Sequence, residues 1–126
     1  MSLLGARQII DETAESPMIR ETATLYEEIR VLLEEPSGAE ENGFLDRLEH
    51  TLTDGYARAL ALEAERVRLE RRMGELAEVL HQSSDDGAAA ELATVARQLA
   101  DADAELSRLR GVLRSLQARA RAIRAA

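Results

Sequence analysis

Apolar residues recur with a seven-residue period along residues 88–124. If Leu92 is taken as position a of a heptad, every a and d position over five heptads is apolar. A helix standing alone would expose such a stripe to water, so the pattern predicts a long helix packed lengthwise against another helix. The a positions are Leu92, Leu99, Leu106, Leu113 and Ala120, and the d positions are Val95, Ala102, Leu109, Leu116 and Ile123.

The same period recurs in residues 45–80, which predicts a second long helix. Only Gly55 and Arg66 depart from the apolar pattern there. Glycine in a helix interior costs about 1 kcal/mol relative to alanine, so Gly55 indicates either a bend or a close approach of two helices. The a positions are Leu45, Leu52, Ala59, Arg66, Met73 and Leu80, and the d positions are Leu48, Gly55, Leu62, Leu69 and Leu76.

Capping and turn residues divide the chain into a short helix and two long ones. Ser16 followed by Pro17 is typical of a helix start, and Pro36 with Gly38 is typical of a helix end. A polar stretch at 81–87 separates the two long helices. We therefore predict a single helical domain over 1–126. It has an N-terminal arm or short helix at 1–15 and helices at 17–35, 40–81 and 87–124.

A connection this short between long helices predicts an antiparallel hairpin resembling a coiled coil. Its register places Arg66 beside Asp103, which would supply a partner for a charge at a core-type position. The shorter helix at 17–35 lies along only part of the hairpin. The predicted fold class is therefore all-α, a three-helix bundle built on an antiparallel hairpin, with Tyr26, Phe44 and Tyr56 filling the core of the three-helix end.

Composition and charge narrow the class of partner. The chain is 45% hydrophobic and only 2% aromatic, and its formal net charge is -8. An acidic chain repels phosphates at long range, which argues against nucleic acid as a partner. The chain has no cysteine, which excludes disulfides and thiolate metal sites, and no apolar run long enough to cross a membrane, so we expect a cytoplasmic protein without membrane insertion.

The half of the hairpin beyond the shorter helix has only two helices, and two helices leave one side of a leucine-rich seam uncovered. A second copy of the chain is the expected cover, because two-fold homodimers are the commonest oligomers. The N-terminal arm is the competing occupant. The candidate dimer face comprises Leu62, Val67, Leu69, Met73, Leu76, Val79, Leu92, Val95, Leu99 and Leu106.

A ladder of arginines near the end of the last helix is the best candidate for contacts with an anionic partner, because guanidinium groups bind phosphate and carboxylate well. Acidic residues of the first 50 positions are expected to pair with it inside the chain, which favours a structural role. The ladder residues are Arg110, Arg114, Arg119, Arg121 and Arg124.

Candidate catalytic chemistry is sparse. Glu78 and His81 have the Glu-x-x-His spacing of helical metal sites, but such sites need two copies of the motif and further carboxylates. His50 stands without a glycine-rich or nucleophile motif nearby, and Ser83 to Asp86 is explained by helix capping. We expect no cofactor and no catalytic residue.

The sequence therefore predicts a non-enzymatic protein that associates with itself and with a protein partner that the sequence does not identify. A regulatory or nucleic-acid-associated helical protein using the arginine ladder is the alternative, and a metal-carboxylate enzyme is the third hypothesis.

Overall fold

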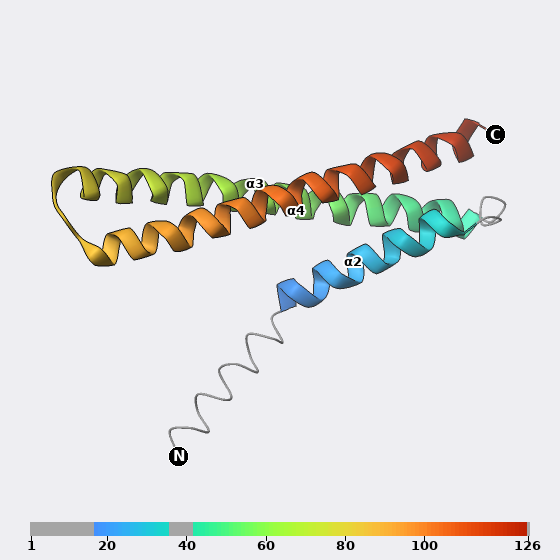
Figure 1. The fold of residues 1–126 in the computed structure, drawn as a ribbon. Coiled ribbons are helices and arrows are strands. Elements are labelled where there is room, and N and C mark those ends of the chain that lie inside the picture. The colour runs from blue at the N-terminus through green and yellow to red at the C-terminus, as the bar shows by residue number, and fades with distance from the viewer. Residues whose placement is uncertain (1–16, 36–41, 126) are drawn as a thin grey trace, which may run out of the picture. The chain divides into compact units, whose positions relative to one another are not determined.

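A computed structural model describes residues 17–35 and 42–125, with side chains from residue 22 onward except residue 42. This part of the chain is all-α, with three helices and no strand (Figure 1). Helix α2 is Pro17–Glu34, α3 is Asn42–Gln82 and α4 is Asp86–Ala125, against predicted ranges of 17–35, 40–81 and 87–124. The predicted arm at 1–15 lies outside the described residues. None of the three helices is long and apolar enough to cross a membrane.

The tertiary contacts divide the chain into two units. The first unit contains the described residues up to Asp54 together with those from Leu116 onward, and the second is Gly55–Ser115. The first unit therefore contains α2 and one end of each long helix. The second unit contains only the remaining parts of α3 and α4.

In the second unit, α3 and α4 run antiparallel and are joined by a short turn (Figure 1). A Cβ atom built on Gly55 would overlap the side chain of Leu113, and its distance to Leu113 Cγ would be only 3.3 Å. Arg66, eleven residues further along α3, lies 3.5 Å from Asp103, ten residues back along α4. These two contacts give the antiparallel register, and they confirm the predicted Arg66 partner. Gly55 is buried within a continuous helix and marks a close approach, not a helix end.

Hydrogen bonds at the turn explain where α3 ends and α4 begins. Asp85 stands immediately before α4, and its Oδ1 accepts a hydrogen bond from the backbone N–H of Ala88 at 3.1 Å. An aspartate at this position satisfies one of the amides that the first helical turn leaves without a carbonyl partner. At the end of α3, the backbone N–H of Ser83 donates to the carbonyl of Val79 at 3.0 Å. The polar segment therefore acts as a pair of helix caps.

The first unit has a well-packed core around Phe44, whose side chain is fully buried. Leu25, Ile29 and Leu32 form the buried stripe of α2, and Leu48 of α3 is also fully buried. The predicted role of Phe44 in this core is thus confirmed.

Tyr56 was expected in the same core, and that expectation is wrong. Its side chain is 44% exposed in the second unit, because the e position of the heptad points away from the seam. Tyr26 of the first unit is half-buried.

The heptad seam predicted for α4 faces the interior. Three of its ten positions are half-buried, Leu92, Leu99 and Ile123, and the other seven are buried. None of the a and d positions of α3 is exposed. The period of apolar residues therefore identified the packed faces of both long helices correctly.

Candidate interaction surfaces

The seam of the second unit becomes thinner toward the turn. Leu106, Leu109 and Leu113 of α4 are at most 2% exposed. Nearer the turn the buried cluster is small, since it contains only Leu76, Ala88 and Val95. The apolar side chains packed against this cluster are only partly buried, namely Leu69, Met73, Leu80 and Leu92. Two helices alone leave these side chains in contact with water.

Three large apolar side chains of α3 lie fully outside the seam in this unit. Leu60 is 66% exposed, Val67 is 48% exposed and Val79 is 39% exposed. Single exposed apolar residues are ordinary on protein surfaces, whereas two on one side of a helix beside a half-covered seam, as Leu60 and Val67 are, favour an interaction surface.

The ten predicted dimer-face residues differ in exposure: some are buried, some are half-buried and two are exposed. Leu62, Leu76, Val95 and Leu106 are buried between α3 and α4, so they hold the pair together and are not available to a partner. The other six are reachable from outside the pair. Leu69, Met73, Leu92 and Leu99 are half-buried, and Val67 and Val79 are exposed.

A bidentate ion pair joins α3 and α4 on one side of the seam near the turn. Arg72 donates from Nε to Glu91 Oε2 at 2.8 Å and from Nη2 to Glu91 Oε1 at 2.9 Å. These hydrogen bonds lower the pKa of Glu91 and, together with Glu75, raise the pKa of Arg72. The side chains of Arg72 and Glu91 are 46% and 45% exposed, so this pair joins α3 and α4 at the surface of the helix pair.

A second set of ion pairs marks the opposite side of the seam. Arg110 of α4 pairs with Glu63 of α3, and Arg66 pairs with Asp103. Between these pairs and the turn, no ion pair bridges α3 and α4 on this side in Gly55–Ser115. The side chains of Arg66 and Asp103 are 41% and 53% exposed, so this pair lies at the surface.

The arginine ladder is largely occupied within the chain. In the first unit, Arg124 Nε donates to Glu49 Oε2 at 3.0 Å, and Arg119 donates to the backbone carbonyl of Glu35, just beyond the end of α2. The guanidinium of Arg119 also lies 5.3 Å from the centre of the Phe44 ring. The Arg124 to Glu49 pair joins α4 to α3 and is the one ion pair among the described residues that matches the predicted pairing of the ladder with acidic residues of the first 50 positions. The acids of α2 pair elsewhere, since Glu27 and Glu34 pair with Arg30.

Only part of the ladder is left for an anionic partner. Arg110 is paired with Glu63, which leaves Arg114 and Arg121 as the ladder members with neither an ion pair nor a side-chain hydrogen bond among the described residues. Two exposed arginines in different units are a small electrostatic footprint, because nucleic-acid binding normally neutralises several phosphates.

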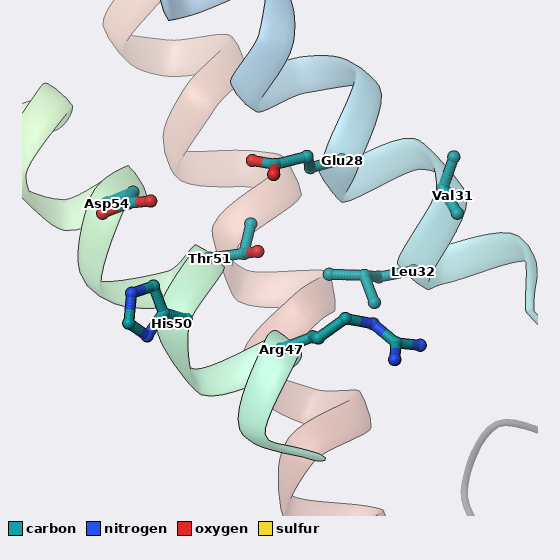
Figure 2. A pocket seen from close by; sticks show the side chains of 7 residues that line it. All are labelled: Glu28, Val31, Leu32, Arg47, His50, Thr51 and Asp54. Carbon is teal, nitrogen blue, oxygen red and sulfur yellow. The ribbon is translucent and has the colours of Figure 1, made fainter. Parts of the chain in front are cut away.

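A groove of about 320 Å³ lies between α2 and α3 in the first unit (Figure 2). Leu32 and Thr51 are its buried residues, and Val31 at the rim is 45% exposed. The rest of the lining is charged or polar and exposed, and comprises Glu28, Arg47, His50 and Asp54. Sequence reasoning missed this groove, since it arises from the packing of two helices and not from a motif.

Of the residues weighed above for catalytic or metal-binding chemistry, only His50 lines this groove. Glu78 and His81 lie in the other unit, where Glu78 accepts a hydrogen bond from Gln82 at 2.9 Å. Among residues 17–35 and 42–125, no three histidine or carboxylate side chains gather closely enough to hold a metal ion. This part of the chain therefore contains no cluster of ligands that would support the metal-carboxylate hypothesis.

Comparisons with known proteins give no further guidance: no family model matches the chain, and no curated protein or solved structure is significantly similar to it.

Proposed function

We propose that this chain is a non-enzymatic, cytoplasmic assembly protein that works by associating with itself and with other proteins. In this proposal, α3 and α4 form a coiled-coil-like hairpin whose two-helix part pairs with a second hairpin, and α2 completes a three-helix bundle at the other end. The observation that carries the proposal is the half-covered apolar seam of Gly55–Ser115.

Burial energetics support this interpretation. Burying apolar surface contributes roughly 25 cal/mol per Å², and a partly exposed leucine forgoes a share of that stabilisation. In the second unit, Leu69, Met73, Leu80 and Leu92 are all left partly exposed beside a small buried cluster. A second pair of helices would cover them and give the usual four-helix arrangement.

Glutamate substitution at exposed flanking positions tests the proposal. Val67 and Val79 lie outside the seam, so Val67→Glu/Val79→Glu should weaken association while leaving each helix pair folded. The matched control is Ala64→Glu/Ala90→Glu, because it adds the same charge at exposed positions on the outer faces of α3 and α4. Light scattering over a concentration series gives the molar mass of each protein.

The expected result is a dimer for the parent and for the control variant, with a monomer for the valine variant at the same concentration. Circular dichroism should show equal helix content in all three. A valine variant that dimerises as tightly as the parent would remove the two-helix part of the chain as the site of association.

A further inference from the structure

We propose that the second copy docks on one particular side of the helix pair, face to face and antiparallel, about a two-fold axis at the level of Gly74 and Thr94. This inference rests on the proposed self-association and adds the face, the orientation and the register of the two copies.

Two stripes of side chains define this face. Along α3, positions three and four residues apart place Val67, Glu70, Gly74, Ala77 and His81 on one side of the helix. Along α4, the same spacing aligns Ala89, Leu92, Ala96, Leu99 and Asp103. Leu92 and Leu99 are half-buried and the other eight residues are exposed.

Ion pairs show that both stripes open on the same side of the helix pair. Glu63 lies seven residues before Glu70 on the α3 stripe, and Arg110 lies seven residues after Asp103 on the α4 stripe. The Glu63 to Arg110 pair joins the two lines directly. The bidentate Arg72 to Glu91 ion pair lies on the opposite side of the seam.

The composition of the face suits close packing against another helical surface. Between Gly74 and the turn on α3, and between the turn and Leu99 on α4, its side chains are small or apolar except His81. A Cβ atom built on Gly74 would meet no atom within 4 Å. Small residues let helix backbones approach closely, and on α4 they alternate with the half-buried Leu92 and Leu99.

The spacing of large and small residues on α4 is self-complementary. Leu92 and Ala96 lie two residues on either side of Thr94, and Ala89 and Leu99 lie five residues on either side. A two-fold axis at Thr94 therefore places each leucine of one copy opposite an alanine of the other. Large side chains facing small ones interdigitate without voids.

The antiparallel register of α3 and α4 makes this axis possible for both helices at once. Gly55 is level with Leu113, and moving nineteen residues along α3 and nineteen back along α4 leads to Gly74 and Thr94. The axis that pairs Leu92 with Ala96 therefore also passes the level of Gly74. The two α3 helices then meet glycine to glycine at their centre.

Charge favours the antiparallel orientation over the parallel one. Residues 73–96 carry five acidic residues, Glu75, Glu78, Asp85, Asp86 and Glu91, and no arginine. A parallel arrangement would bring the two acidic turn ends together, and like charges in proximity are destabilising. The antiparallel arrangement places the turn of one copy at the level of Arg66 of the other.

The area of the face is close to the lower limit for a specific dimer interface. Each stripe spans 15 residues, about 21 Å at 1.5 Å per residue, and two packed helices present a face about 20 Å wide. The face of each copy therefore covers roughly 400 Å² in projection. The uneven side-chain surface adds to the accessible area, which brings the total for both copies near roughly 1,000 Å², the lower limit for a specific interface.

Cysteine cross-linking tests the face and the register directly, because the parent chain has no cysteine. Under mild oxidation, Gly74→Cys should form a disulfide-linked dimer by itself. Leu92→Cys and Ala96→Cys should each cross-link poorly alone, whereas their mixture should give mainly the mixed disulfide. Thr94→Cys is the matched control, since it lies at the same level on the opposite side and should remain reduced at least tenfold longer than Gly74→Cys.

Glutamate variants give an independent readout of the same face. Val67→Glu should raise the dissociation constant at least tenfold, and Val79→Glu, which is 120° further around α3, should change it less than threefold. The reverse pattern in a dimeric parent, or cross-linking of Thr94→Cys instead of Gly74→Cys, would overturn this face while leaving self-association in place.

A monomeric parent at tens of micromolar would overturn both this inference and the proposed function. If such a parent dimerised only after removal of residues 3–15, the face would belong to the N-terminal segment instead of a second copy. A dimer in which Leu92→Cys cross-links efficiently to itself and not to Ala96→Cys would contradict the register.

Discussion

Gly55 should tolerate alanine poorly, although it lies inside a helix where alanine is normally the better residue. Replacing an interior helical glycine by alanine contributes up to about 1 kcal/mol of stability. The added methyl group at this position would overlap Leu113, which is only 2% exposed and therefore has little room to move. Overpacking a well-packed core costs about 1–3 kcal/mol, so Gly55→Ala should be neutral or destabilising by up to about 2 kcal/mol.

Gly111 provides the matched control in the same unit. Its nearest neighbour for an added methyl group is Arg114 Nη2 at 3.9 Å, which is ordinary van der Waals contact. Gly111→Ala should therefore stabilise the protein by about 0.5–1 kcal/mol. The two alanine variants, measured by urea unfolding at one protein concentration, should differ by about 1–3 kcal/mol.

A double-mutant cycle makes the test specific to the contact. In a Leu113→Ala background the clash is absent, so Gly55→Ala should become stabilising, as it is at Gly111. Equal stabilisation by alanine at both glycines in the parent, or an unchanged Gly55→Ala effect in the Leu113→Ala background, would refute the packing of Leu113 on Gly55.

Three further predictions concern the polar contacts of the second unit. A double-mutant cycle of Arg66→Ala and Asp103→Ala should give a coupling of about 0.2–1 kcal/mol, because the pair is exposed, and a larger value would mean that it is desolvated. Asp85→Ala should destabilise the protein by about 1 kcal/mol through loss of the helix cap, and Asp85→Asn, which keeps the acceptor, should recover most of it in thermal unfolding. Because Arg72 lowers the pKa of Glu91, this carboxylate adds stability above its unfolded-state pKa and loses it as the pH falls through the folded-state pKa. In an NMR titration Arg72→Ala should therefore raise the pKa of Glu91, and an unchanged value would contradict the bidentate pair.

The sequence predicted the packed faces of the long helices because a seven-residue apolar period can be satisfied only by lengthwise packing. It also predicted Arg66 opposite Asp103, since a short turn leaves little freedom of register. The degree of burial was harder to predict. A heptad assignment treats every a position alike, whereas a seam between only two helices leaves Arg66 in contact with water.

The candidate surface shows the same limitation. Four of the ten predicted dimer-face residues are buried by packing within the chain and are not available to a partner, namely Leu62, Leu76, Val95 and Leu106. Gly74 and Ala96 are too small to stand out in a hydrophobic pattern. We propose them for the dimer face only because the Glu63 to Arg110 ion pair shows which side of the helix pair they occupy. Residue type alone does not distinguish an alanine on an interface from one on a solvated face.

Sedimentation equilibrium of the full chain over a wide concentration range tests self-association most directly. Self-association predicts a reversible transition between a monomer of 13.9 kDa and a dimer of twice that mass, with the dimer predominating at tens of micromolar. A constant mass of 13.9 kDa up to that concentration would contradict it.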